Sequence, residues 1–183
     1  LALVYEEASH LAGHEQKALD WHMKSALSGN ATSMEALGKI YAFGLLRQKE
    51  DEHKALAWLE KGASLGSVDA HYYAGLIYAV AKEKGLRNPA KATFHLEAAR
   101  KMGSDLAAYA LAHAYLFGDT LIKQDKDRGY SILKELHKTE SSYLAYELES
   151  AIYVKGLDRP VNTQKAVLNS LNAIRQKLSK GEE

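Results

Sequence analysis

Two stretches of the chain decide its fold: LGKIYAFG at residues 37–44 and DEHKALAWLEKGASLG at residues 51–66. The first stretch places its apolar residues on one face of a helix, and the second does the same after a polar loop. Asp51 is a preferred N-cap residue at the start of the second stretch, and Gly66 suits the left-handed position that ends a helix. The two stretches therefore predict a pair of helices joined by a loop.

The same residue types recur along the chain at a step of 37 residues, which is the signature of a repeat protein. Three ladders follow this step: Tyr41, Tyr78 and Tyr115; Ala18, Ala55, Ala92, Gly129 and Ala166; and Gly29, Gly66 and Gly103. N-cap positions follow it too, at His14, Asp51, Asn88, Asp125 and Asn162. The ladder tyrosines are predicted to lie in the core, and small residues at Gly38, Gly75 and Ala112 suit close contact between helices.

The ladders predict a single all-α domain over residues 1–183, built from tandem helix–turn–helix repeats that form a solenoid. We expect a partial or variant repeat at 1–30, full repeats at 31–67, 68–104 and 105–142, and a degenerate repeat at 143–183. Glu149, Ser150 and Asn169 depart from the pattern, and the final helix from Ser170 to Lys180 is polar, so we expect a C-terminal cap and a true end there. The chain begins without methionine and already in helical pattern, so we expect an excised fragment or a processed chain.

Residues 37–66 resemble the Sel-one-like repeat (SLR), a relative of the tetratricopeptide repeat, in the pattern LGxxYxxG followed by DxxxAxxW. The resemblance extends over nearly the whole chain. It implies a right-handed α-α superhelix that acts as a non-catalytic scaffold or adaptor, in bacterial envelope or signalling complexes. It also favours the periplasm or cell envelope over the cytoplasm.

The resemblance further implies where a partner protein would bind. In tetratricopeptide repeats the concave groove is lined by positions nine, six and two residues before the repeat tyrosine and one and two residues after it. Carried over, this gives a surface for a partner peptide or helix that includes Glu35, Lys39, Phe43, Tyr72, Leu76, Tyr109, His113, Leu116 and Phe117. The alternative interpretation is that some of these residues pack against the next repeat instead.

Composition and motifs argue against other classes of function. Lys and Arg total 24 against 23 Asp and Glu, for a net charge of +1, so a nucleic-acid partner is disfavoured. No run approaches the roughly 18 to 20 apolar residues of a membrane-spanning helix. The chain has no cysteine, no GxGxxG, GxxxxGK[ST] or HExxH motif, and only one histidine pair at i, i+4, His10 with His14. We therefore expect no catalytic residues, no metal and no cofactor.

Two alternatives to a scaffold remain open. Some SLR proteins resemble β-lactam-binding or β-lactam-hydrolysing proteins, although those relatives tend to carry a cysteine pair in each repeat. The other alternative is a self-assembling structural protein whose end repeats stack between chains; the oligomeric state is open. His95, at the tryptophan position of its repeat, is predicted to be a partly buried packing residue with one hydrogen bond.

Overall fold

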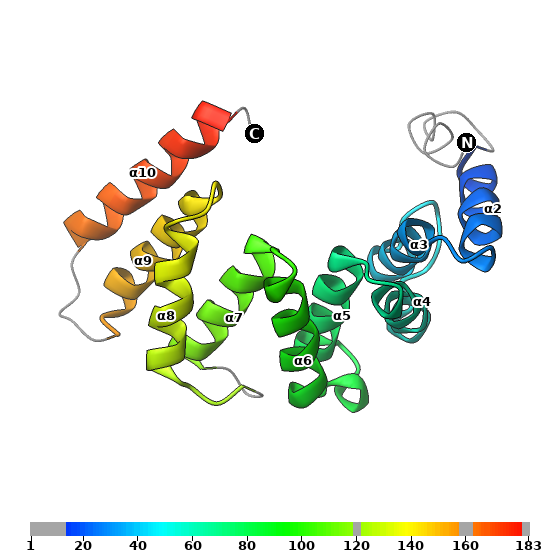
Figure 1. Cartoon of the computed structure of the whole chain (residues 1–183), viewed down its shortest axis with the longest axis horizontal. Coiled ribbons are helices and arrows are strands. Elements are labelled where there is room, and N and C mark those ends of the chain that lie inside the picture. Colours follow the sequence, from blue (N-terminus) through cyan, green and yellow to red (C-terminus); the bar gives the residue numbers. More distant parts are fainter. Residues whose placement is uncertain (1–13, 119–121, 158–162, 181–183) are drawn as a thin grey trace. The chain divides into compact units, whose positions relative to one another are not determined.

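The computed structural model describes residues 14–118, 122–157 and 163–180, and all secondary structure within them is helical. The described helices fall into two compact units, one ending at Met102 and the other beginning at Gly103 (Figure 1). The N-terminal unit contains α2 (His14–Leu27), α3 (Ala31–Phe43), α4 (Glu52–Ser64), α5 (Val68–Val80), the short 3-10 helix η1 (Lys84–Leu86) and α6 (Pro89–Lys101). The C-terminal unit contains α7 (Asp105–Phe117), α8 (Lys126–Leu136), α9 (Ser142–Lys155) and α10 (Thr163–Lys180).

Each predicted pair of helices forms an antiparallel hairpin: α3 packs on α4, α5 on α6, α7 on α8 and α9 on α10. The first helices α3, α5 and α7 carry the repeat tyrosines near their ends, and Tyr41, Tyr78 and Tyr115 are buried as predicted. The glycine ladder also behaves as predicted, because Gly29, Gly66 and Gly103 adopt φ angles of 87°, 85° and 95° just after α2, α4 and α6. A residue with a Cβ would be strained there.

The predicted N-caps join the two helices of a hairpin in the same way three times. The side chains of Asp51, Asn88 and Asp125 accept the backbone N–H of the residue three positions on, at 2.9, 3.0 and 3.1 Å. The backbone N–H groups of these caps donate to the carbonyls of Tyr41, Tyr78 and Tyr115 at 2.8, 2.9 and 2.9 Å. The cap therefore starts the second helix and also fastens it to the last turn of the first.

A cationic side chain from the first turn of the second helix lies over the ring of each repeat tyrosine. Lys54, Lys91 and Arg128 give their backbone N–H to the cap residue, and their side chains lie 5.4, 4.8 and 5.0 Å from the centroids of the tyrosine rings. Such contacts contribute about 0.5 to 1 kcal/mol at exposed sites. The first helices have a second cap ladder that our sequence interpretation did not include: Asn30, Ser67 and Ser104 cap α3, α5 and α7.

Small residues let the helices of a hairpin approach closely, as predicted at Gly38 and Gly75. A Cβ on Gly38 would lie under 3.0 Å from Leu59 of α4, and one on Gly75 would lie 2.7 Å from Cγ of Leu96 in α6. Leu59 and Leu96 are almost completely buried. The two contacts are one repeat apart, so each glycine makes room for the leucine opposite it.

The last hairpin replaces this apolar contact by hydrogen bonds. The hydroxyls of Ser150 and Ser170 lie 2.9 Å apart, and Asn169 donates its side-chain N–H to Glu149 at 3.1 Å. These residues occupy the positions that hold Gly38, Leu59 and their neighbours in the first hairpin. The departures from the repeat pattern are therefore matched in pairs across α9 and α10.

Candidate partner-binding surface

The nine residues predicted to bind a partner all lie on the first helices of hairpins. Five are in the N-terminal unit, with Glu35, Lys39 and Phe43 on α3 and Tyr72 and Leu76 on α5. The other four, Tyr109, His113, Leu116 and Phe117, follow one another along α7 in the C-terminal unit. The structure therefore forms two candidate surfaces, one in each unit.

The N-terminal aromatic surface consists of Phe43, Tyr72 and Tyr73 together with Lys39. The Phe43 ring meets Tyr73 edge to face at 6.0 Å between centroids, and Tyr73 meets Tyr72 at 5.1 Å. Phe43 is 56% exposed, so a large apolar ring faces solvent beside two amphipathic ones. Tyr73 was absent from the sequence prediction, and its signal was an aromatic residue where the neighbouring repeats have alanine.

Lys39 is held in place on this surface by Glu35. Their side chains form an ion pair at 3.0 Å, and the Ser67 hydroxyl at the start of α5 donates to the other oxygen of Glu35 at 3.1 Å. Burial lowers the pKa of Lys39, but the hydrogen bond and charge of Glu35 outweigh it and leave that pKa above its ordinary value. Lys39 therefore stays protonated and lies 5.6 Å from the centroid of the Tyr73 ring.

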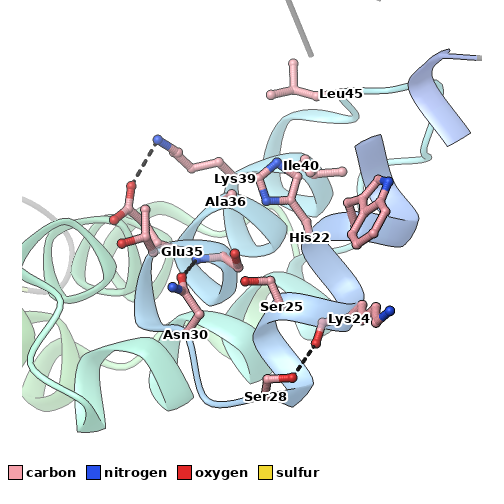
Figure 2. Close-up of a pocket in the computed structure, with 13 residues that line it drawn as sticks. His22, Lys24, Ser25, Ser28, Asn30, Glu35, Ala36, Lys39, Ile40 and Leu45 are labelled. Atoms are coloured by element: carbon pink, nitrogen blue, oxygen red, sulfur yellow. Dashed lines mark hydrogen bonds and ion pairs between the residues drawn. The ribbon is translucent and has the colours of Figure 1, made fainter. Parts of the chain in front are cut away.

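A pocket of about 770 Å³ opens beside Lys39, where α2 approaches α3 (Figure 2). Its size is in the range of sites that accept a small ligand or one or two side chains of a peptide. Lys39 belongs to both the pocket and the aromatic surface, which makes the two continuous. The pocket is lined by Trp21, His22, Lys24, Ser25, Ser28, Asn30, Thr32, Ser33, Glu35, Ala36, Lys39, Ile40 and Leu45.

The α2 side of this pocket was not predicted. The positions carried over from the tetratricopeptide pattern are counted from a repeat tyrosine, and α2 has tryptophan, histidine and serine residues but no such tyrosine. Trp21 on α2 was the available signal, because tryptophan is enriched at the hot spots of protein interfaces.

The C-terminal aromatic surface consists of Tyr109, His113 and Phe117 on α7 with Lys155 on α9. His113 lies between the two other rings, at 6.3 Å from Tyr109 and 4.7 Å from Phe117 between centroids. The Lys155 ammonium lies 4.2 Å from the centroid of Phe117. Burial and the nearby charge of Glu147 raise the pKa of Tyr109, so its hydroxyl remains a neutral hydrogen-bonding group.

A sequence model described as Sel1 repeat matches residues 31–67, 68–104 and 105–135, which is more than half of the chain. The chain belongs to the Sel1 repeat family. Sel1 repeats build helical scaffolds of the kind used for protein interaction, and the all-α fold of tandem helix–turn–helix repeats is confirmed. A comparison with curated proteins gave no match.

Two solved structures show the same fold. One is the crystal structure of a protective antigen from uropathogenic Escherichia coli strains that displays an SLR fold, with a TM-score of 0.70 and 22% identity. It matches 100% of this chain, which spans 37% of that protein's chain. The other is a Sel1 repeat protein from Oxalobacter formigenes, with a TM-score of 0.72 and 25% identity over 94% of this chain and 68% of that one.

Within the third Sel1 repeat, the prediction that Leu116 lines the binding surface is wrong. Leu116 is 0% exposed. Its Cγ would lie 2.5 Å from a Cβ on Gly129, so the glycine in α8 provides the space that the leucine fills. The first two Sel1 repeats have alanine at both positions, Ala42 with Ala55 and Ala79 with Ala92. The loss of the ladder alanine at Gly129 was the sequence signal that a larger side chain is buried opposite it.

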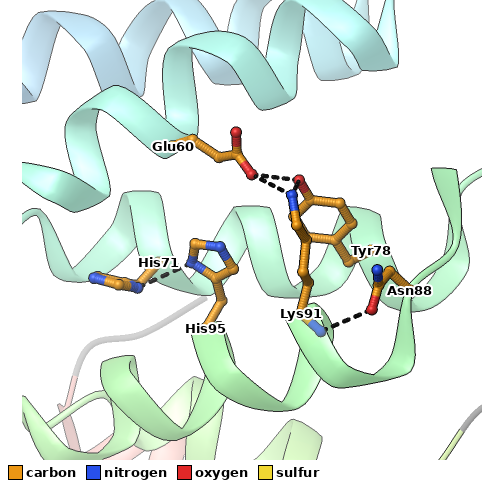
Figure 3. A network of polar contacts seen from close by, with 6 residues as sticks. All are labelled: Glu60, His71, Tyr78, Asn88, Lys91 and His95. Atoms are coloured by element: carbon orange, nitrogen blue, oxygen red, sulfur yellow. Dashed lines mark hydrogen bonds and ion pairs between the residues drawn. The ribbon is translucent and has the colours of Figure 1, made fainter.

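Within the second Sel1 repeat, His95 belongs to a network of polar side chains on α4, α5 and α6 (Figure 3). As predicted, it is a buried packing residue with a hydrogen bond: its Nδ1 lies 3.0 Å from Nδ1 of His71, and its ring stacks on Tyr78 at 5.8 Å. The Tyr78 hydroxyl donates to Glu60, and Lys91 donates to both. The network fastens the second repeat to α4 of the first.

The pKa values in this network favour a neutral histidine pair. Burial and the charge of His71 lower the pKa of His95 to about 4, against the opposing charge of Glu60. Burial also lowers the pKa of His71. Because one Nδ1 must donate and the other accept, the contact suits two neutral rings.

Among the described residues, no helix is long and apolar enough to cross a membrane. The same residues contain no group of three or more histidine, aspartate or glutamate side chains that could hold a metal ion. His10, one member of the i, i+4 histidine pair, lies outside the described residues.

Proposed function

We propose that this Sel1 repeat protein is a non-catalytic scaffold or adaptor that binds a peptide or helix of a partner protein along the first helices of its repeats. The observation that carries the proposal is the N-terminal aromatic surface, where Phe43 is more than half exposed beside Tyr72 and Tyr73 and next to an open pocket. Aromatic side chains give large contact area at little cost in conformational entropy, and they are enriched at interface hot spots.

The arrangement gives the partner segment a defined chemistry. The exposed rings offer apolar contact, and the pocket beside them accepts a side chain among hydroxyl groups and the indole of Trp21. Lys39 is held by Glu35 at the point where rings and pocket meet, so its position is fixed before a partner arrives. A rigid, preorganised surface of this kind lowers the entropic cost of binding. An envelope or signalling setting is supported by the family resemblance alone.

The test begins by selecting binding peptides from a random displayed library on the whole chain. The selected peptides are then measured against Phe43→Ala/Tyr72→Ala and Tyr109→Ala/Phe117→Ala, which remove one aromatic surface each. Phe94→Ala is the matched control, because Phe94 is a 64% exposed aromatic residue on the second helix α6.

We expect at least one aromatic double variant to weaken binding about tenfold or more, which corresponds to roughly 1.4 kcal/mol. Phe94→Ala should bind as the wild-type chain does, and all variants should keep the helical circular dichroism and a similar urea midpoint. Equal binding by all variants would refute the proposal. Unfolding of both double variants would show instead that these rings belong to the core.

A further inference from the structure

The N-terminal aromatic surface has a carboxylate at its edge, Asp69. This residue lies in the first turn of α5, three and four positions before Tyr72 and Tyr73, so the three side chains share one helix face. Asp69 is exposed, and its side chain forms no ion pair or hydrogen bond with any residue that the structure describes. An exposed negative charge is therefore available beside two tyrosine rings.

The charges around this edge do not cancel. Burial raises the pKa of Tyr72, and Tyr73 and Asp69 raise it further. Burial lowers the pKa of Lys39, and the charge of Asp69 adds to that of Glu35 in raising it. The Lys39 ammonium is paired with the Glu35 carboxylate at 3.0 Å, as Figure 2 shows. Two carboxylates thus share one ammonium group, and the charge of Asp69 is left without a partner.

The rings of both aromatic surfaces already have a cation of the chain itself beside them. The Lys39 ammonium lies 5.6 Å from the centroid of Tyr73, and the Lys155 ammonium lies 4.2 Å from that of Phe117. Cations favour the face of an aromatic ring, which is its negative side. No cationic side chain of the described residues lies over Tyr72, which is partly exposed. This ring and Asp69 together can receive a cation from outside the chain.

The repeat pattern does not require a carboxylate at this position. One step before Asp69 the chain has Thr32, and one step after it Leu106. The C-terminal aromatic surface therefore has an apolar residue where the N-terminal one has a negative charge. The difference gives the N-terminal surface a preference of its own for the charge of a partner.

We propose that the partner segment bound by the N-terminal aromatic surface carries an arginine, whose guanidinium stacks on Tyr72 and pairs with Asp69. This inference rests on the proposed function and names the chemistry of the partner. A planar guanidinium stacks on aromatic rings and donates two parallel hydrogen bonds to a carboxylate. Lys39 repels a second cation, so one arginine beside apolar residues that contact Phe43 fits better than a run of basic residues.

The test starts from the peptides selected on the whole chain. The tightest binder is synthesised with arginine and with citrulline, which has a planar head group similar to that of arginine but no charge. Both peptides carry fluorescein and are titrated by fluorescence anisotropy with the wild-type chain, Asp69→Asn and Asp127→Asn. Asp127 is the matched control, because it is an exposed aspartate in the first turn of a second helix, α8.

We expect the selected peptides to be enriched in arginine. The citrulline peptide should bind the wild-type chain and Asp127→Asn about tenfold more weakly than the arginine peptide. In Asp69→Asn this ratio should fall to about threefold or less, while circular dichroism and the urea midpoint stay as in the wild-type chain. Affinity for the arginine peptide should decrease as salt is added. Selection repeated on Asp69→Lys should enrich aspartate and glutamate instead.

The outcomes separate this inference from the proposed function. Peptides that lose affinity with Phe43→Ala/Tyr72→Ala but show no enrichment in arginine would refute the arginine site and leave the scaffold function standing. An equal effect of citrulline in the wild-type chain and in Asp69→Asn would also refute it, because the cation would then be bound by another group. If no peptide is selected at all, both proposals fail.

Discussion

Replacing Gly129 by alanine is expected to change stability in opposite directions, depending on the residue at position 116. In the wild-type chain the new Cβ would lie 2.5 Å from Cγ and 2.9 Å from Cδ2 of Leu116. Overpacking of this kind costs about 1 to 3 kcal/mol, and the better helix propensity of alanine returns about 0.8 to 1 kcal/mol. The net expectation is a destabilisation of about 1 kcal/mol.

Leu116→Ala alone should cost about 3 kcal/mol, because Leu116 is completely buried and the truncation leaves a cavity. In that background the contact with the leucine side chain is gone. Leu116 N remains 3.1 Å from the new Cβ, and the alanine pairs of the first two repeats show that this spacing can be accommodated. Gly129→Ala should then stabilise by about 1 kcal/mol through helix propensity.

The assay is urea unfolding of the four proteins of this cycle, followed by circular dichroism. Comparison of the midpoints at equal m-values gives a coupling free energy, which we expect to be about 2 kcal/mol. If Gly129→Ala had the same effect in both backgrounds within about 0.5 kcal/mol, Leu116 and Gly129 would not form a matched pair.

Three further results are expected. The fold holds the pKa of His95 at about 4, below its unfolded value, so the full contribution of the neutral ring to stability is present above about pH 6.5. The free energy of unfolding should fall as the pH decreases, by up to about 3 kcal/mol. His95→Phe should reduce that loss in urea titrations, and an unchanged pH dependence would contradict this role of His95. Asn88→Ala removes the cap of α6 and should cost about 1 kcal/mol, so an unaltered urea midpoint would mean that the cap contributes little. Gly75→Ala should lower the melting temperature, because its Cβ would collide with Leu96. Gly85→Ala should leave the melting temperature unchanged, because its Cβ would meet only an oxygen of Glu83 at 3.9 Å. Equal effects of the two substitutions would contradict the packing argument.

The parts of the fold that depend on local chemistry were predictable from the sequence. Asp51 and Gly66 mark the two ends of a helix by their side chain and their backbone freedom, and neither needs information about the rest of the chain. Because the repeat step is constant, the same residue types mark the helix ends in the other repeats. The close contacts at Gly38 and Gly75 were predictable for the same reason.

The surface was predictable only in part, because solvent exposure depends on which residue lies opposite. Phe43 and Tyr109 were found by counting positions from a repeat tyrosine. Leu116 occupies one of the same counted positions, but its side chain is buried because Gly129 on the opposite helix of the hairpin leaves space for it. Tyr73 lies outside the counted positions, although its ring contacts both Phe43 and Tyr72.

In three hairpins the N-cap of the second helix donates a hydrogen bond to the tyrosine carbonyl of the first, and this bond closes the loop between the two helices. Residues 44–50 pass through left-handed conformations at Leu46 and Arg47, with φ of 50° and 59°, whereas residues 81–87 contain the 3-10 turn η1. Both loops nevertheless return the chain to the same cap and the same carbonyl. Apart from Leu46 and Leu86, which pack against the hydrophobic clusters, the loop residues can therefore be changed or the loops extended, since doubling a loop costs only about 0.6 kcal/mol in closure entropy. These loops are sites where the protein can acquire new contacts, by evolution or by engineering, without altering the hairpins.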